Sequence, residues 1–249
     1  MDTAAGLHAH WAHARATARR HLTLCYPTVA AMVGEAALHT LADWLWRLTP
    51  PTGGDLGTWG GTLPDLLRDR LPTPAWWRPP EGSHPASDLA HWPWLADAAA
   101  LDWARHQAER EALAPVDTAA LSALADVDPS LTRLVLQAHV QLVFSAWPLT
   151  ALWAAHRLPE SQQAQAAAQA LSTPTSSADC TRCTVVWWTP EGVQHAPLSP
   201  AEGHWMFALR HRPALSLAEA LQQASPELDL GAWLVRALQS GWLVGTEPH

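Results

Sequence analysis

Residues 184–245 read TVVWWTPEGVQHAPLSPAEGHWMFALRHRPALSLAEALQQASPELDLGAWLVRALQSGWLVG, and this stretch decides the fold of the chain. The β-branched and aromatic residues at 184–189 predict a strand, because such side chains pack well on a pleated sheet. A Pro-Glu-Gly turn at 190–192 reverses the chain, and residues 193–198 predict a second strand.

Three helices follow, and each has a recognisable start. SPAE at 199–202 and SLAE at 216–219 match the capping box, in which a Ser and a Glu side chain accept each other's backbone N–H. Asp229 is a third N-cap, and the apolar residues after it recur at i, i+3, i+4, i+7 and i+8. Gly241 ends this helix, and a short strand returns after it. The order strand, strand, helix, helix, helix, strand predicts a winged-helix-like module over residues 183–249.

The preceding residues 1–158 predict a Trp-rich helical domain. Pro27 begins a short helix, Gly34 interrupts it, and residues 35–48 predict a second helix that ends before two prolines. A longer helix is expected over residues 94–114. We therefore expect a mainly α protein with a small α+β module at its C-terminal end.

Two further segments complete the expected helical domain. Asp128-Pro129 is typical of a helix start, and apolar residues recur at helical spacing through Leu142. Pro148 begins another helix that ends near His156. Residues 159–182 are low in complexity and have few large apolar residues, so we expect a linker there.

Composition limits the classes of function. The chain has a net charge of −8, 16 tryptophans, and arginine as its only basic residue apart from histidine, so it repels phosphate backbones on average. We expect the tryptophans to fill core positions. The alternative is that some of them form a recognition surface, because tryptophan is favoured at binding hot spots. Three cysteines make no disulfide framework and favour a reducing, cytoplasmic compartment. We expect no secretory signal, and the uncharged run between Arg133 and Arg157 is interrupted by polar residues and Pro148, which argues against a membrane span.

Candidate chemistry is sparse. Cys180 and Cys183 form a lone C-x-x-C, which lacks the two further ligands of a structural zinc, so they are the only metal candidates and no metal is expected. A histidine cluster near the N-terminus (His8, His10 and His13) suits a solvated helix. We expect His139 and His156 to be hydrogen-bonded in the helical core. With no catalytic pattern either, we expect a chain that is not an enzyme.

Two classes of binding function are considered for the C-terminal module, DNA binding and peptide binding. Binding DNA through the third helix is disfavoured, because residues 180–249 hold four arginines against six carboxylates. Capture of an extended peptide is favoured, with an edge strand as template and tryptophans as pockets. The expected peptide-binding residues are Val185, Val186, Trp187, Trp188 and Trp233.

Five segments in this order resemble the HvfC/BufC-like family, whose members carry a domain labelled as DNA-binding. They are YPTVAAMVGEAALHTLA (26–42), PPTGGDLGTWGGTLPDLL (50–67), WLADAAALDWA (94–104), QAHVQLVFSAWPLTALWAAH (137–156) and the C-terminal module. Trp59 stands where the family commonly has tyrosine, and Asp102 where it usually has glutamate.

The resemblance implies an accessory subunit of a TIM-barrel, multinuclear-iron peptide oxidase that modifies cysteines in ribosomally made precursor peptides. The iron would belong to the partner, and this chain, with no cofactor of its own, would hold the leader of the Cys-containing precursor on a peptide-recognition-element-like module. The expected partner-interface residues are Trp59, Asp97, Asp102 and Trp103. A DNA-binding transcriptional regulator is the alternative, and a stand-alone interaction protein is a third possibility.

Overall fold

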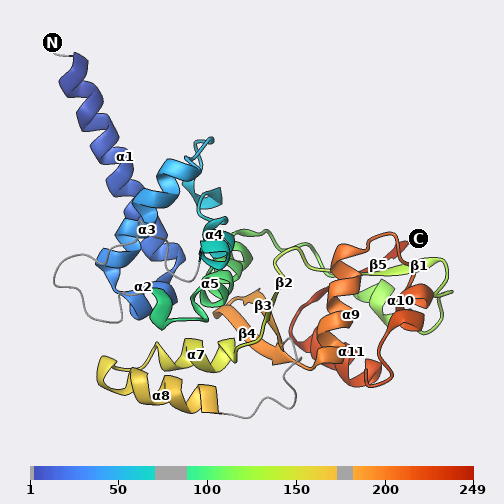
Figure 1. Cartoon of the computed structure of the whole chain (residues 1–249). Coiled ribbons are helices and arrows are strands. Elements are labelled where there is room, and N and C mark those ends of the chain that lie inside the picture. The colour runs from blue at the N-terminus through green and yellow to red at the C-terminus, as the bar shows by residue number, and fades with distance from the viewer. Residues whose placement is uncertain (1–2, 71–88, 173–181) are drawn as a thin grey trace. The chain divides into compact units, whose positions relative to one another are not determined.

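The computed structural model of the chain describes residues 3–70, 89–172 and 182–249. It is mostly helical, with small antiparallel sheets in the C-terminal part (Figure 1). The chain forms two compact units, Met1–Trp103 with Ala151–Ser172, and Ala104–Thr150 with Thr173–His249. These units do not follow the boundaries expected at 158 and 182, because the segment 104–150 carries two strands that pair within the C-terminal unit.

The first unit, called the helical unit below, is built from α-helices joined by short 3-10 turns. Its elements are α1 (Thr3–Cys25), α2 (Pro27–Val33), α3 (Glu35–Leu48), η1 (Leu56–Thr58), α4 (Leu63–Arg70), η3 (Leu89–His91), the start of α5 (Leu95–Arg110), the greater part of α7 (Leu149–Ala155), and α8 (Glu160–Ser172). Helices α2, α3 and α5 confirm the expected ones, whereas α8 occupies much of the expected linker. No helix in the described ranges is long and apolar enough to cross a membrane.

A buried carboxylate holds α2 in place. The side chain of Tyr26 at the N-cap does not cap α2, and Asp102 of α5 instead accepts a hydrogen bond from the backbone N–H of Thr28 at 2.7 Å. The same carboxylate accepts the Thr28 hydroxyl at 2.7 Å and the Val29 N–H at 3.2 Å. Asp102 therefore supplies from 74 residues away the cap that the local sequence lacks.

The glycine-rich loop within residues 50–67 packs against the start of α2, next to Asp102. The Tyr26 hydroxyl donates to the carbonyl of Gly60 at 2.6 Å, and the Tyr26 ring stacks on Trp103 with centroids 6.0 Å apart. Gly60 has a φ of 118°, and a Cβ on Gly61 would lie 2.9 Å from the Trp103 ring, so both positions need glycine. Three of the segments that carry the family resemblance thus meet in one buried cluster.

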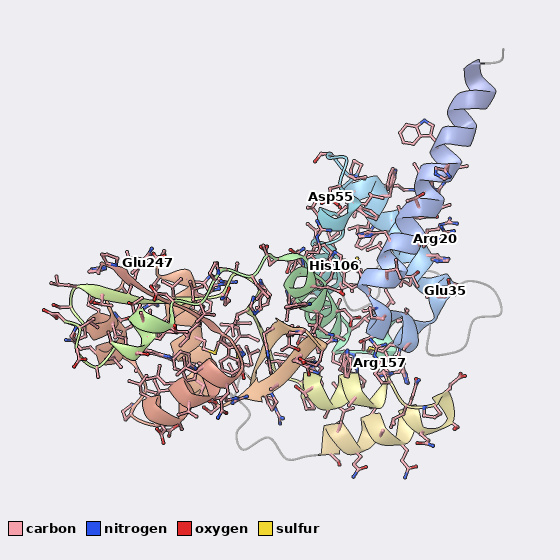
Figure 2. The ribbon with its side chains drawn as sticks, turned by 180° about the vertical axis from the view of Figure 1, so that it is seen from behind. Arg20, Glu35, Asp55, His106, Arg157 and Glu247 are labelled. Atoms are coloured by element: carbon pink, nitrogen blue, oxygen red, sulfur yellow. The ribbon has the colours of Figure 1, made fainter. Side chains whose placement is uncertain are left out.

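The second unit, the C-terminal unit, contains two small antiparallel sheets. Its described elements after α5 are α6 (Thr118–Ser122), β1 (Thr132–Leu136), β2 (Gln141–Ser145), β3 (Arg182–Thr189), β4 (Gly192–Leu198), α9 (Pro200–His211), α10 (Leu217–Gln223), α11 (Leu230–Gln239) and β5 (Leu243–Pro248). Strand β1 pairs with β5, and β2, β3 and β4 form the other sheet in that order. Glu247 of β5, labelled in Figure 2, pairs with Arg133 of β1.

The helix expected from Asp128 through Leu142 is wrong, since β1 and β2 occupy this stretch. Burial alternates residue by residue along β1, which is the period of a strand rather than of a helix. The turn between the strands is held from outside: the Arg210 side chain donates to the carbonyl of Gln137 at 3.1 Å and to that of Val140 at 2.7 Å. Long-range strand pairing overrides the local helical spacing here.

The three C-terminal helices begin as expected. Both capping boxes are present, at Ser199 with Glu202 and at Ser216 with Glu219, and the Asp229 side chain caps α11. Gly241 has a φ of 67°, which is the left-handed conformation of a helix end.

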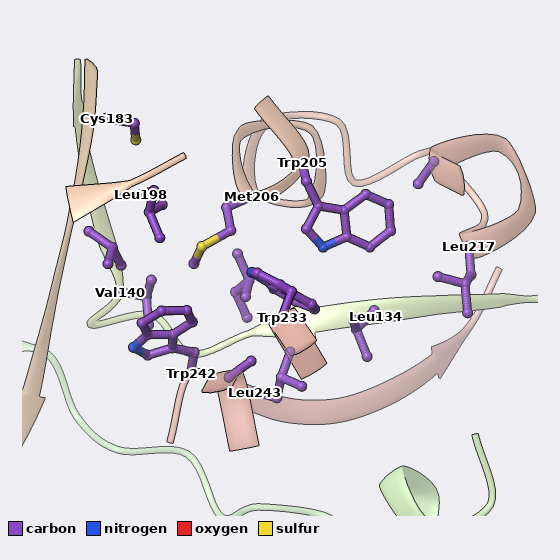
Figure 3. Close-up of a cluster of buried hydrophobic side chains, with 14 residues drawn as sticks. Leu134, Val140, Cys183, Leu198, Trp205, Met206, Leu217, Trp233, Trp242 and Leu243 are labelled. Carbon is purple, nitrogen blue, oxygen red and sulfur yellow. The ribbon is translucent and has the colours of Figure 1, made fainter. Parts of the chain in front are cut away.

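Tryptophans form the centre of this unit. Figure 3 shows the indoles of Trp205, Trp233 and Trp242 gathered among aliphatic side chains. Trp205 and Trp233 meet edge to face, with centroids 5.6 Å apart. Helix α9 packs closely on β3, because a Cβ on Gly203 would lie only 2.6 Å from the Cβ of Cys183.

Protonation of Asp102 should stabilise the fold. Burial raises the pKa of Asp102 to about 6, despite the hydrogen bonds from Thr28 and Val29. The folded pKa lies above the unfolded one, so this contribution is present below pH 4 and is lost as the pH rises through 6. Relative to Asp102→Asn, which does not titrate, the wild type should gain about 2 kcal/mol of unfolding free energy between pH 7 and pH 4. Urea denaturation at both pH values measures this, and an unchanged difference would contradict it.

Adding one methyl group at Gly203 should force α9 away from β3. We expect Gly203→Ala to lower the free energy of unfolding by roughly 1–3 kcal/mol, because the new Cβ overlaps that of Cys183. Gly231→Ala on α11 is the matched control, since its Cβ would meet only the Asp229 side chain at an ordinary 3.5 Å. Thermal unfolding of both variants tests the pair, and equal melting temperatures would refute the close approach.

Candidate functional site

Strand β3, expected as a peptide template at its edge, lies inside the sheet. Val186 is paired with Gln141 of β2 on one side and with His195 of β4 on the other. Val185 and Val186 are fully buried. The expectation that 185–188 is an edge strand is therefore wrong for these two valines, because β2 from an earlier part of the chain closes that side.

The tryptophans expected to form peptide pockets are buried in the core to different extents. Trp233 is only 1% exposed and packs on Trp205. Trp187 is partly buried and meets Trp242 edge to face with centroids 5.4 Å apart, and Trp188 is also partly buried. A peptide-binding role for these residues stays a prediction.

The outer strands of this sheet are β2 and β4, and the outer edge of β4 lies beside α11. In the described part of the chain, β4 pairs with β3 alone. The carbonyl of Pro197 points outward, because it accepts a hydrogen bond from the Arg236 side chain at 3.2 Å. Successive residues of a strand direct their backbone groups to alternate sides, so the N–H and C=O groups of Val193 and His195 also point outward. Sequence reasoning found this strand but assigned the edge to its neighbour.

Helix α11 lies beside this edge. Arg236 donates to Pro197, approaches Glu202 of α9 at 3.3 Å, and covers the ring of Trp242 at 5.2 Å. Elsewhere the surface of α11 is mostly apolar, with Val235 54% and Leu238 51% exposed beside the exposed Gln239. The cation of this helix is therefore engaged within the unit.

His195 on β4 is uncharged at neutral pH. Burial lowers the pKa of His195 to about 4, and the charge of Arg105 adds to the shift. The His195 Nδ1 atom lies 2.8 Å from Arg105 Nη1, so the unprotonated Nδ1 accepts a hydrogen bond from the guanidinium. This pair fixes the side chain of His195 while its backbone groups face outward.

The four residues expected at a partner interface lie within the helical unit. Trp59 is 7% exposed and its indole N–H donates to the Thr49 carbonyl at 2.6 Å. Asp97 pairs with Arg68 at 3.1 Å. Asp102 caps α2, and Trp103 stacks on Tyr26. These contacts give each residue a structural role, and a role toward a partner stays a prediction.

The structure also gives the positions of some of the cysteines and histidines considered as metal ligands or bases. Cys180 lies outside the described residues, as do the side chains of His8 and His10, whereas Cys183 is 1% exposed. The expectation of a hydrogen-bonded ring is wrong for His139, because neither of its ring nitrogens has a partner among the described residues. At His156, where burial lowers the pKa, a side-chain interaction with Gln163 raises it in part, so the expectation stays a prediction there. Burial lowers the pKa of both histidines, which keeps them uncharged in apolar surroundings.

Taken together, the C-terminal unit presents an open strand edge beside a helix with an apolar surface. Such an arrangement can bind an extended chain through backbone hydrogen bonds and hold its side chains by apolar contact. No family model, curated protein or solved structure matches the chain.

The Cys183 thiol should be inert in the folded protein. Burial raises its pKa to about 12, and the charge of Glu202 adds to the shift, so the nucleophilic thiolate is scarce at neutral pH. After iodoacetamide treatment at pH 8, peptide mapping should show Cys183 unmodified in the native protein and modified in urea. Rapid native labelling of Cys183 would contradict this.

Proposed function

We propose that this chain is a non-catalytic partner subunit of an iron-dependent peptide-modifying oxidase complex. In this proposal its C-terminal unit is a winged-helix-like, peptide-recognition module that binds the leader of a precursor peptide, and the chain also docks the barrel enzyme. The open edge of β4 carries the proposal, since an extended peptide can join the sheet there and this edge lies beside α11.

The peptide would add to β4 as a further strand. Val193 offers an outward N–H and C=O, and Pro197 offers a carbonyl where the Arg236 side chain already donates. The absence of an N–H at Pro197 suits an outward position at an edge, where no ladder bond is lost. Specificity would come from the peptide side chains that meet α11.

Charge supports peptide over DNA. Residues 180–249 hold four arginines against six carboxylates, so the module supplies few cations to neutralise phosphates. On α11, which would be the recognition helix, the one arginine contacts Glu202 and the Pro197 carbonyl. The DNA-binding alternative therefore lacks a supporting observation.

The oxidation reaction would take place in the partner enzyme. The family resemblance assigns the iron and the oxidation of cysteine to a TIM-barrel enzyme, with this chain delivering the precursor. The three cysteines make no disulfide framework, which suits the reducing cytoplasm where such complexes would work.

A proline in the outer edge of β4 should weaken peptide binding. Val193→Pro removes an outward N–H while keeping the ladder to β3, so we expect roughly tenfold lower affinity, as for loss of a hydrogen bond and its alignment. Val193→Ala is the control, because it trims the side chain and keeps the N–H. The probe is the synthetic leader of a short Cys-containing precursor, sought among the genes that neighbour this chain's gene, and calorimetry measures the binding.

Two results would count against the proposed function. Equal affinity of the Pro and Ala variants would exclude β4 as the template. Specific binding of duplex DNA at physiological salt by the wild type, with no binding of the precursor, would favour the transcriptional regulator instead.

A further inference from the structure

A second surface of the C-terminal unit is an apolar groove of about 470 Å³, called the leucine groove below. This volume falls within the range of roughly 300–1,000 Å³ that is usual for ligand sites. Ser122 is the one polar residue in its lining. The lining residues are Leu121, Ser122, Leu124, Ala125, Val127, Pro129, Leu134, Leu217, Leu221, Leu230, Leu234, Leu238 and Leu243.

The groove has a fixed floor and walls. Leu134, Leu217 and Leu243, labelled in Figure 3, belong to the buried core beneath it. The segment 117–130 forms one wall and is tied at both ends. The Asp117 N–H donates to the Val244 carbonyl at 2.7 Å, and the Ala218 N–H donates to the Pro129 carbonyl at 2.8 Å.

The chain around the groove is acidic. Residues 117–130 and 216–230, which supply most of its lining, hold six carboxylates and no basic residue. All six residues are exposed, so the two segments that supply most of the lining carry only negative charge. They are Asp117, Asp126, Asp128, Glu219, Glu227 and Asp229.

The groove lies on the opposite face of α11 from the β4 edge. Arg236 is two residues from both Leu234 and Leu238, which corresponds to a rotation of about 200° around a helix. Arg236 contacts Pro197 of β4, whereas Leu234 and Leu238 line the groove. The two surfaces are therefore separate sites on one unit.

The lining selects the secondary structure of the occupant. It consists of side chains from helices, a turn and the mutually paired strands β1 and β5, and the Val244 carbonyl of β5 is taken by Asp117. An extended peptide would bury its backbone groups here without partners, which costs free energy, whereas a helix satisfies its own backbone. The surrounding carboxylates favour cationic flanks and disfavour an anionic lipid.

We propose that the leucine groove binds an amphipathic helix of a partner protein, with an apolar stripe flanked by Lys and Arg. The apolar stripe enters between α10, α11 and the 121–129 turn, and the basic flanks face the six carboxylates. This interaction goes beyond leader binding at β4 and does not depend on it.

A designed helix tests the proposal on the full chain. The probe is a fluorescent peptide of about 18 residues, long enough to form an isolated helix, with Leu at i, i+3, i+4 and i+7 and Lys elsewhere. Fluorescence anisotropy should show binding of this peptide that weakens with added salt. A peptide of the same composition with the apolar stripe scrambled, and one with Glu in place of Lys, should bind at least tenfold more weakly.

Paired variants locate the site. Leu238→Gln in the groove should weaken binding about tenfold, and Val235→Gln, equally exposed on α11 but outside the groove, should leave it unchanged. Asp126→Arg should weaken binding roughly fivefold, against no change for the same charge reversal at exposed Glu191.

Equal effects within either pair, or equal binding of the scrambled peptide, would overturn the proposal. Circular dichroism confirms that each variant is folded. Because Val193→Pro affects the other face, its effect on precursor binding separates failure of the groove from failure of the proposed function.

Discussion

The helical unit depends on one carboxylate buried without a basic partner in its hydrogen-bond shell. Asp102 accepts both the backbone N–H and the hydroxyl of Thr28, and so joins α5 to the start of α2. An acid in such a place loses hydration, which raises its pKa to about 6. The contact also sets the positions of Tyr26 and Trp103, which enclose the glycine loop. The resemblance-bearing motifs therefore specify a packing arrangement first, and partner contacts could use only what this packing leaves exposed.

In the C-terminal unit the corresponding constraint is strand order. Strand β2 comes from residues 141–145 and pairs with β3, so β3 cannot present an edge at Val185 and Val186. The outer strands are therefore β2 and β4, and β4 lies beside α11. The proposed site of peptide addition is thus one strand away from the expected one, and Arg236 rather than the valines lies next to it.

Sequence predicted the elements whose signals are local. Caps at Ser199, Ser216 and Asp229 depend on residues three positions away and are all present. The strands β1 and β2 were missed because their partners are distant: Thr132 pairs with Pro248, and no local pattern carries that information. The open edge and the leucine groove could not be predicted for the same reason, since both follow from which strands pair.

The two surfaces of the C-terminal unit demand different partners for a physical reason. The edge of β4 has no further strand paired to it in the described chain, and an extended chain is the partner that can add there as a strand. The leucine groove offers apolar side chains within an acidic surround, which suit a helix that needs no backbone partner. Because α11 separates the two surfaces, occupancy of one leaves the other open. A chain that holds a precursor and another protein at once needs this division, whereas a DNA reader would need cations on α11 that this sequence does not supply.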